Sequence, residues 1–269
     1  MALLVNYRTN AKGISMELAG KTIVITGGGR GLGAAMAKRL AATGSRLALV
    51  DLDEAVLAET AEACREAGAQ EVRTYTVNVA VEPDVEKLIG DIANDFGALH
   101  GLVNNAGITR DALTLKYKDG EQVSKMSLEQ WQAVIDVNLT GVFLCGREAA
   151  AKMIEFGDGG CIINISSISR AGNMGQLNYS ATKAGVEAMA VVWAKEFARY
   201  GIRAASVAPG FIGTEMVMSM KPEALEKLSG MIPSRRIGDP DEIAHTVQFI
   251  FENDYLSGRC VEVDGALRL

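Results

Sequence analysis

Histidine and cysteine are scarce in this chain of 269 residues. The two histidines, His100 and His245, lie 145 positions apart, and no two of the four cysteines form a C-x-x-C pair. Zinc and similar metals need clustered imidazole and thiolate ligands, so no metal site is expected. The same scarcity excludes a thioredoxin-type redox centre. A secreted scaffold held by disulfides is also excluded, because a chain of this length can bury a core of its own.

Proline, long apolar runs and positive charge are also in short supply. Five prolines stand against 29 glycines, which indicates tight turns between regular elements. No stretch approaches the roughly 18 apolar residues of a membrane-spanning helix, and the N-terminus has no signal-peptide pattern. With 27 basic and 33 acidic residues the net charge is −6, so the composition offers no footprint for nucleic acid. We therefore expect a cytoplasmic protein with no nucleic-acid or membrane partner.

The sequence does contain a regular alternation of strand and helix patterns. Short β-branched or apolar runs such as KTIVIT (21–26) and RLALV (46–50) alternate with helical segments that end at glycine. This rhythm predicts βαβ units, and hence a single-domain, doubly wound (Rossmann-type) α/β fold with a mainly parallel sheet and helices on both faces. Residues 1–17 lack the pattern and are expected to form a flexible N-terminal leader, which leaves 18–269 as the domain.

A glycine-rich turn, TGGGRGLG (26–33), joins the first predicted strand to the first predicted helix. Glycines let the main chain approach a pyrophosphate, and the N–H groups at a helix N-terminus suit an anion. In this position the turn favours dinucleotide binding over a merely tight connection.

The identity of the cofactor depends on the end of the second predicted strand. Asp51 stands there, where a carboxylate binds ribose hydroxyls and repels a 2′-phosphate. The alternative role for an acidic residue is to cap the next helix, and Asp53 is equally well placed for it. Arg30 could meet a 2′-phosphate, but the clash at Asp51 is more direct. NAD is therefore favoured over NADP.

A tyrosine and a lysine share one face of a predicted helix, because Tyr179 and Lys183 are four residues apart. An ammonium group one turn away favours the phenolate, which brings a tyrosine toward a useful acid–base range. Taken alone, a Y-x-x-x-K pair is more often a solvated helix face. Here NISS (164–167) ends the strand before it and offers a serine hydroxyl for a substrate carbonyl.

Together these stretches resemble the short-chain dehydrogenase/reductase family, over essentially everything from residue 17 onward. Further matches are NNAG (104–107), Asn138 within DVNLTG, PG (209–210) and VDG (263–265). GNMGQLNYSATKAG (172–185) and ITRD (108–111) resemble the 3-oxoacyl-acyl-carrier-protein reductases in particular.

The resemblance implies a catalytic set of four residues. Tyr179 is implied to be the general acid/base, and Lys183 to bind the nicotinamide ribose and lower the tyrosine pKa. Asn138 is implied to hold a water in a proton relay that runs through Lys183. The choice of serine is open: Ser166 has the usual spacing of 13 residues before the tyrosine, whereas Ser167 is the second serine of the stretch, which usually takes the role. We choose Ser167, because a strand end is more rigid than a loop.

The resemblance also implies which residues surround a nicotinamide cofactor. The glycine turn would hold the pyrophosphate, the ends of the next two strands the adenosine, and the segments near the tyrosine the nicotinamide. Where Asn78 stands, the family more often has an aspartate. The expected cofactor-binding residues are Gly27, Arg30, Gly31, Leu32, Gly33, Asp51, Leu52, Asn78, Val79, Asn105, Ala106, Gly107, Tyr179, Lys183, Pro209, Gly210, Ile212 and Thr214.

The implied activity is reversible hydride transfer between a nicotinamide cofactor and a ketone or secondary alcohol. The implied substrate is a 3-oxoacyl thioester, which acyl carrier protein could present. The alternatives are an NAD-dependent steroid, sugar or polyol dehydrogenase and, from a different class, a non-catalytic NAD-binding regulator. Asp51 and the extra polar sequence at 118–127 both depart from the reductase pattern.

Substrate specificity is expected to come from two loops, 108–127 and 211–236. Methionines cluster in the second loop, which points to an adaptable lid rather than to core packing. Long helices predicted over 128–156 and 179–200 would pair subunits, and the family resemblance implies a homotetramer.

Overall fold

Parallel strands form the centre of the molecule. The computed structural model describes residues 16–269, and within them one seven-stranded sheet has the order β3-β2-β1-β4-β7-β8-β9, with every neighbouring pair parallel. The predicted doubly wound sheet is therefore confirmed. Its strands are β1 (Thr22–Thr26), β2 (Arg46–Asp51), β3 (Glu71–Thr76), β4 (Gly101–Asn104), β7 (Gly160–Ile165), β8 (Ile202–Pro209) and β9 (Cys260–Val263).

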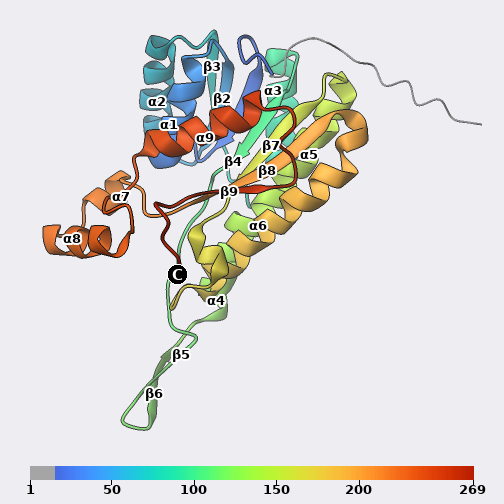
Figure 1. Cartoon of the computed structure of the whole chain (residues 1–269). Coiled ribbons are helices and arrows are strands. Elements are labelled where there is room, and N and C mark those ends of the chain that lie inside the picture. The colour runs from blue at the N-terminus through green and yellow to red at the C-terminus, as the bar shows by residue number, and fades with distance from the viewer. Residues whose placement is uncertain (1–15) are drawn as a thin grey trace, which may run out of the picture.

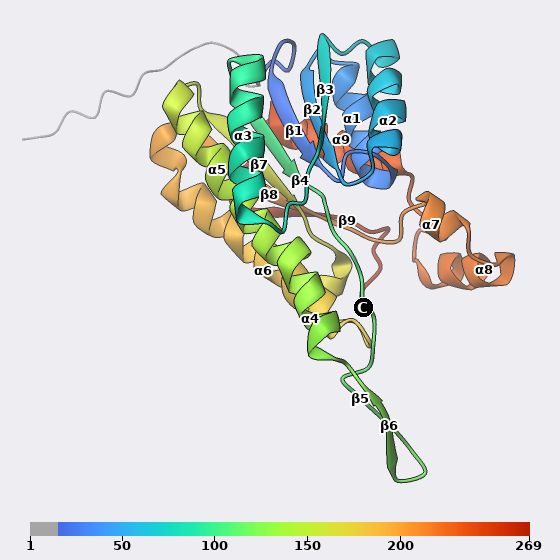
Figure 2. The same cartoon turned by 180° about the vertical axis from the view of Figure 1, so that it is seen from behind.

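Helices cover both faces of this sheet. Helices α1, α2 and α9 lie on one face and α3, α5 and α6 on the other (Figures 1 and 2). Side chains alternate along each strand, so Ile23 and Ile25 enter the core under α1 while Val24 enters the opposite core. The helices are α1 (Gly31–Ala41), α2 (Glu54–Ala67), α3 (Glu82–Phe96), α4 (Leu128–Ile135), α5 (Gly141–Phe156), α6 (Leu177–Glu196), α7 (Glu215–Met218), α8 (Pro222–Met231) and α9 (Pro240–Glu252).

The order of the strands fixes where a ligand can bind. Chain order runs outward in one direction from β1 through β2 to β3, and in the other direction from β4 onward. In a sheet of this kind ligands bind outside the carboxyl ends of the strands, at the point where the winding reverses. That point lies between β1 and β4. The segments that follow β1, β4, β7 and β8 therefore meet at one edge.

The long helix predicted over 128–156 is interrupted. A π-helical turn (Asp136–Thr140) separates α4 from α5, and the Gly141 N–H donates to the carbonyl of Asp136, five residues earlier. The helix predicted over 179–200 begins earlier and ends at Glu196, before a short 3₁₀ turn (Ala198–Tyr200). π-helical turns are rare and occur mostly as single turns within α-helices, so a continuous helix was predicted across this one.

Part of the predicted loop 108–127 forms a β-hairpin that stands away from the body (Figures 1 and 2). Strands β5 (Leu115–Lys118) and β6 (Glu121–Lys125) pair antiparallel, and every residue of both is exposed. Asp119 and Gly120 both have positive φ, as in a type I′ turn, whose twist matches that of the strands. We call residues 112–127 the arm.

The predicted leader falls almost entirely outside the described residues, since only Met16 and Glu17 of it are described, and Met16 packs against the core. Among residues 16–269, no helix is long and apolar enough to cross a membrane. In the same part of the chain, no group of three or more His, Cys, Asp or Glu residues is arranged to hold a metal ion.

Candidate active site

The turn between β1 and α1 is packed so closely that it requires glycine. A Cβ at Gly33 would lie 1.9 Å from the carbonyl oxygen of Gly27, and Gly27 itself has φ +63°. Asn105 braces the turn from β4: its Nδ2 donates to the carbonyls of Thr26 at 3.1 Å and Gly27 at 2.9 Å. The turn thus allows close approach of its main chain to a ligand, and the bonds from Asn105 fix its shape.

The N-terminus of α1 is open to an anion. Its capping residue, Arg30, makes no side-chain cap hydrogen bond, and the first turn of the helix has no acidic residue. The N–H groups of this turn therefore lack a capping side chain, which is the arrangement that a pyrophosphate satisfies. Gly31 has φ +55° and faces Thr214 across the turn.

Asp51 ends β2 beside the glycine turn. Its carboxylate accepts the Gly29 N–H at 3.1 Å and the Leu52 N–H at 2.8 Å, which fixes its orientation. Asp53 caps α2 instead, by accepting from the N–H groups of Ala55 and Val56. Capping of α2 therefore falls to Asp53, and Asp51 is left on the wall of the cavity.

Two adjoining cavities run along this edge of the sheet and share Leu32, Asn105, Gly107 and Thr214. The first, of about 440 Å³, is bounded by the ends of β1, β2 and β3 and includes Arg30, Asp51, Leu52, Asn78, Val79 and Ala106. The second, of about 230 Å³, includes Ser167, Tyr179, Lys183, Pro209, Gly210 and Ile212. Nearly all the residues predicted to bind the cofactor thus line one continuous trench. A larger hollow of about 760 Å³ lies at the opposite edge and contains none of them.

The two candidate serines point in different directions. Ser166 is buried, and its hydroxyl donates to the carbonyl of Lys183 at 2.8 Å. The Ser167 hydroxyl accepts the N–H of Ser169 at 3.1 Å and makes a hydrogen-bond contact with Tyr179. The structure therefore brings Ser167, not Ser166, to the phenol. A 3₁₀ turn (Ile168–Ala171) and two positive-φ glycines shape the short connection that follows.

Burial dominates the electrostatics of the tyrosine and the lysine. Burial raises the pKa of Tyr179, the contact with Ser167 lowers it, and the charge of Asp111 raises it. Burial lowers the pKa of Lys183 to about 8. The Lys183 ammonium donates to the carbonyl of Ile165 at 2.7 Å and lies 5.4 Å from the centre of the Tyr179 ring. The Tyr179 pKa is raised overall, with burial as the largest cause, so the lowering by Lys183 that the family resemblance implies stays a prediction.

Asn138 sits in the π-helical turn and is fully buried. Its Oδ1 accepts the Ile108 N–H at 2.8 Å and its Nδ2 donates to the Ile108 carbonyl at 2.9 Å. The oxygen and the nitrogen of the Asn138 side-chain amide therefore both anchor the start of the loop 108–127.

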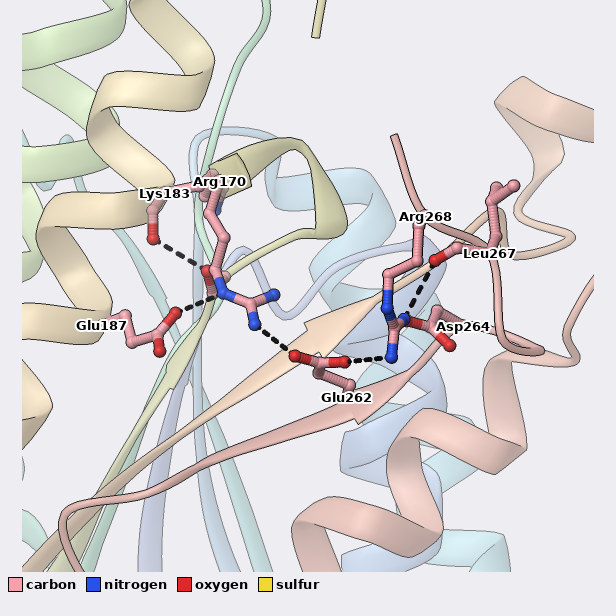
Figure 3. Close-up of polar contacts among 8 residues, drawn as sticks. Arg170, Lys183, Glu187, Glu262, Asp264, Leu267 and Arg268 are labelled. Atoms are coloured by element: carbon pink, nitrogen blue, oxygen red, sulfur yellow. Dashed lines mark hydrogen bonds and ion pairs between the residues drawn. The ribbon is translucent and has the colours of Figure 1, made fainter. Parts of the chain in front are cut away.

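An ion-pair network supports the segment after Ser167 (Figure 3). Arg170 pairs with Glu187 of α6 and, at 2.5 Å, with Glu262 of β9. Arg268 joins the same Glu262 at 2.8 Å and also pairs with Asp264. The network ties the 3₁₀ turn after Ser167, the tyrosine helix α6, β9 and the C-terminal segment together.

The segment after β8 closes the trench from the other side. Phe211 and Val217, which the sequence analysis did not single out, line the smaller cavity. The PG turn just before them was the available indication. Met218, Met220 and Met231 are 56%, 43% and 56% exposed, so these three do not pack into the core.

Comparison with known proteins agrees with this geometry. The family model "short chain dehydrogenase" matches residues 21–225. A 3-oxoacyl-[acyl-carrier-protein] reductase of Synechocystis sp. is 40% identical over 93% of this chain and 98% of its own length. An acetoacetyl-CoA reductase of the same organism is 39% identical over 94% of this chain and 98% of its own.

A solved structure extends the likeness to the fold. A protein from Agrobacterium tumefaciens, provisionally described as a gluconate dehydrogenase, superposes with a TM-score of 0.83 at 32% identity, over 93% of this chain and 97% of that one.

Proposed function

The chain belongs to the short-chain dehydrogenase family, and from this premise we propose that it transfers a hydride between a nicotinamide cofactor and a 3-oxoacyl or 3-hydroxyacyl thioester. The observation that carries the proposal is that Ser167, Tyr179 and Lys183 together line the smaller cavity, with Ser167 in contact with Tyr179. Relatives that act on 3-oxoacyl and acetoacetyl thioesters point to the substrate class.

The trench fits a dinucleotide. The glycine turn offers a close approach that a Cβ at position 33 would fill, and α1 offers uncapped N–H groups. Gly27, Arg30, Gly31, Leu32 and Gly33 would surround the pyrophosphate, Asp51, Leu52, Asn78 and Val79 the adenosine, and Pro209, Gly210, Ile212 and Thr214 the nicotinamide, with Asn105, Ala106 and Gly107 along the floor. When bound, the cofactor supplies or accepts the hydride.

The protein's own groups would handle the proton. In the reducing direction Tyr179 would donate its phenolic proton to the oxygen of the carbonyl as negative charge develops there. The Ser167 hydroxyl, directed to the same point, would donate a hydrogen bond to that oxygen. Lys183 would hold the nicotinamide ribose and pass protons toward the π-helical turn around Asn138.

We propose NAD as the preferred form of the cofactor. Both oxygens of Asp51 are held by backbone N–H groups, so the carboxylate cannot easily turn away from a ligand in the 440 Å³ cavity. A 2′-phosphate beside it would meet like charge in a partly buried site. Arg30 is exposed and, among the described residues that line this cavity, is the one that would favour NADP.

The remaining expectations concern the setting of the enzyme. The loops 108–127 and 211–236 flank the trench and are proposed to choose the substrate, with Met218 and Met220 in the lid. Acyl carrier protein is proposed as one carrier of the acyl group, and a cytoplasmic homotetramer as the form of the enzyme. Exposed Phe143, Ile154 and Val192 on α5 and α6 support pairing through these helices.

A substrate and cofactor panel tests the function. The purified chain would be assayed with acetoacetyl-CoA, longer 3-oxoacyl thioesters on CoA and on acyl carrier protein, a steroid ketone and a polyol, each with NADH or NAD and with the phosphorylated form. We expect turnover with 3-oxoacyl thioesters and NADH. Turnover confined to steroids or polyols would replace the substrate proposal, and turnover confined to the phosphorylated cofactor would refute the role given to Asp51.

A further inference from the structure

Asn178, directly before Tyr179, is fully buried and uses every polar group of its side chain. Its Nδ2 donates to the carbonyls of Arg110 at 3.1 Å and Gln130 at 3.0 Å. Its Oδ1 accepts the main-chain N–H of Tyr179 at 2.8 Å. One side chain thus joins the tyrosine's backbone to two other segments.

Those two segments are the roots of the arm. Arg110 precedes β5, and Gln130 lies in the first turn of α4, after β6. The second root is itself fixed by a capping box in which the Ser127 hydroxyl accepts the Gln130 N–H and the Gln130 side chain accepts the Ser127 N–H. The Asn178 amide therefore holds both ends of the segment from Arg110 to Gln130 at a single point beside Tyr179.

Gln176 makes a second tie next to the first. Its Nε2 donates to Asp111 at 2.9 Å, and its Oε1 accepts from the Ser169 hydroxyl at 3.0 Å and from Asn173 at 2.9 Å. The main chain adds a bond from the Ala112 N–H to the carbonyl of Gly175 at 2.9 Å. The first root is thereby joined to the segment that carries Ser167 as well as to the tyrosine helix.

We propose that Asn178 is a positioning residue that seats Tyr179 against both roots of the arm. The proposal rests on the acid/base role proposed above for Tyr179. Asn178 contacts the tyrosine only through its backbone, so it acts through the tyrosine rather than on substrate. An amide is required, because two carbonyl oxygens need two N–H donors while the tyrosine N–H needs an acceptor.

The substitution Asn178→Asp tests this with almost no change in volume. The acceptor for Tyr179 is kept, but a carboxylate oxygen now faces two carbonyls, so the roots should part from the helix. We expect kcat to fall by roughly 10- to 100-fold, because small misplacements of a catalytic group cost that much. The dissociation constant for NADH, measured by fluorescence titration, should stay within about twofold, since the cofactor cavity does not include this residue.

Hydrogen exchange supplies a readout that needs no turnover. In Asn178→Asp, amides of 108–113 and 126–130 should exchange faster together, while those of β1 and α1 stay protected. Asn253→Asp is the matched control: its Oδ1 also accepts a nearby main-chain N–H, that of Tyr255, but it lies at the end of α9. Its kcat and root exchange should match the unaltered chain.

The outcomes separate the two proposals. If the unaltered chain turns over no substrate, the proposed function fails, while exchange at the roots still shows whether Asn178 anchors them. The positioning role is overturned if amide exchange at the roots becomes faster in Asn178→Asp while kcat is unchanged. It is also overturned if the variant folds and exchange at the roots does not change. Should Asn178→Asp not fold, Gln176→Leu, at a half-buried site, removes the second tie and should show the same pattern more weakly.

Discussion

The glycine turn and the arm both follow strands of the sheet at the edge where the trench lies, but the turn is closely packed and the arm is exposed. At the turn, a single added carbon at Gly33 would lie 1.9 Å from another backbone atom, and Asn105 bonds the turn twice. In the arm, every strand residue is exposed, and only its own ladder and its roots restrain it. Crowding makes the first region intolerant of change, whereas the second tolerates change along its length and is sensitive only where it is rooted.

The largest effect is expected at Tyr179, the proposed acid/base, which lines the same trench as the glycine turn. Tyr179→Phe removes one hydroxyl and keeps the ring, so turnover should fall by about 10³-fold while NADH still binds. Steady-state rates together with NADH fluorescence measure the two properties separately. Unchanged turnover would mean that this trench only binds its cofactor, as in a regulator.

The two adjacent serines should separate chemistry from structure. Ser167→Ala should lower kcat by about 10²-fold, because it removes the hydrogen bond directed at the reacting oxygen. Ser166→Ala should cost about 1 kcal/mol of unfolding free energy, through loss of the bond to the Lys183 carbonyl, and change kcat only a few-fold. Steady-state kinetics and urea unfolding of both variants measure these two effects. A larger loss of kcat in Ser166→Ala than in Ser167→Ala would give Ser166 the catalytic role.

A smaller effect should come from Asp111, at the first root of the arm. Its charge raises the pKa of Tyr179, so Asp111→Asn should lower that pKa. Alcohol oxidation needs the tyrosine as phenolate, so the acid limb of kcat/KM for oxidation should move to lower pH. The asparagine can still accept from Gln176, which keeps the tie. A shift of the acid limb to higher pH would contradict the effect assigned to the Asp111 charge on the Tyr179 pKa.

The smallest effect on catalysis is expected from cutting the arm itself. Met126 donates to the carbonyl of Leu113 at 3.1 Å, a bond that can close a tight turn. Two glycines in place of residues 114–125 should therefore leave the roots where they are. kcat and NADH affinity should stay within about twofold. A change confined to KM for long or carrier-bound acyl thioesters would assign the arm to the substrate. If the shortened chain lost as much kcat as Asn178→Asp, the arm would be sensitive along its length and not only at its roots, contrary to our proposal.

The crowded region could be predicted from sequence because its demands are specific to residue type. The glycines at 27–33, Asp51 after β2 and the Tyr179–Lys183 spacing each follow from a local geometric need. The structure places Gly27, Asp51, Tyr179 and Lys183 along one trench. The parallel fold followed from the strand–helix rhythm alone.

The remainder depends on long-range contacts that no local pattern encodes. One continuous helix was predicted over 128–156 because π-helical turns are rare within α-helices. The direction of the Tyr179 pKa depended on the degree of burial, which spacing does not give. Asn178 escaped notice because its partners, Arg110 and Gln130, are 68 and 48 residues away.

Because hydrogen bonds close the base of the hairpin, the segment beyond that base can be replaced as a unit. Since the bonds from Met126 already bring its two ends together, inserting 12 residues there costs only about 2 kcal/mol of loop-closure entropy, and that cost grows slowly with length. We therefore expect that residues 114–125 can be exchanged for other sequences without disturbing the trench. A fluorophore, a peptide tag or a binding loop from another protein could be grafted there and would report from the rim of the site while Tyr179 kept its place.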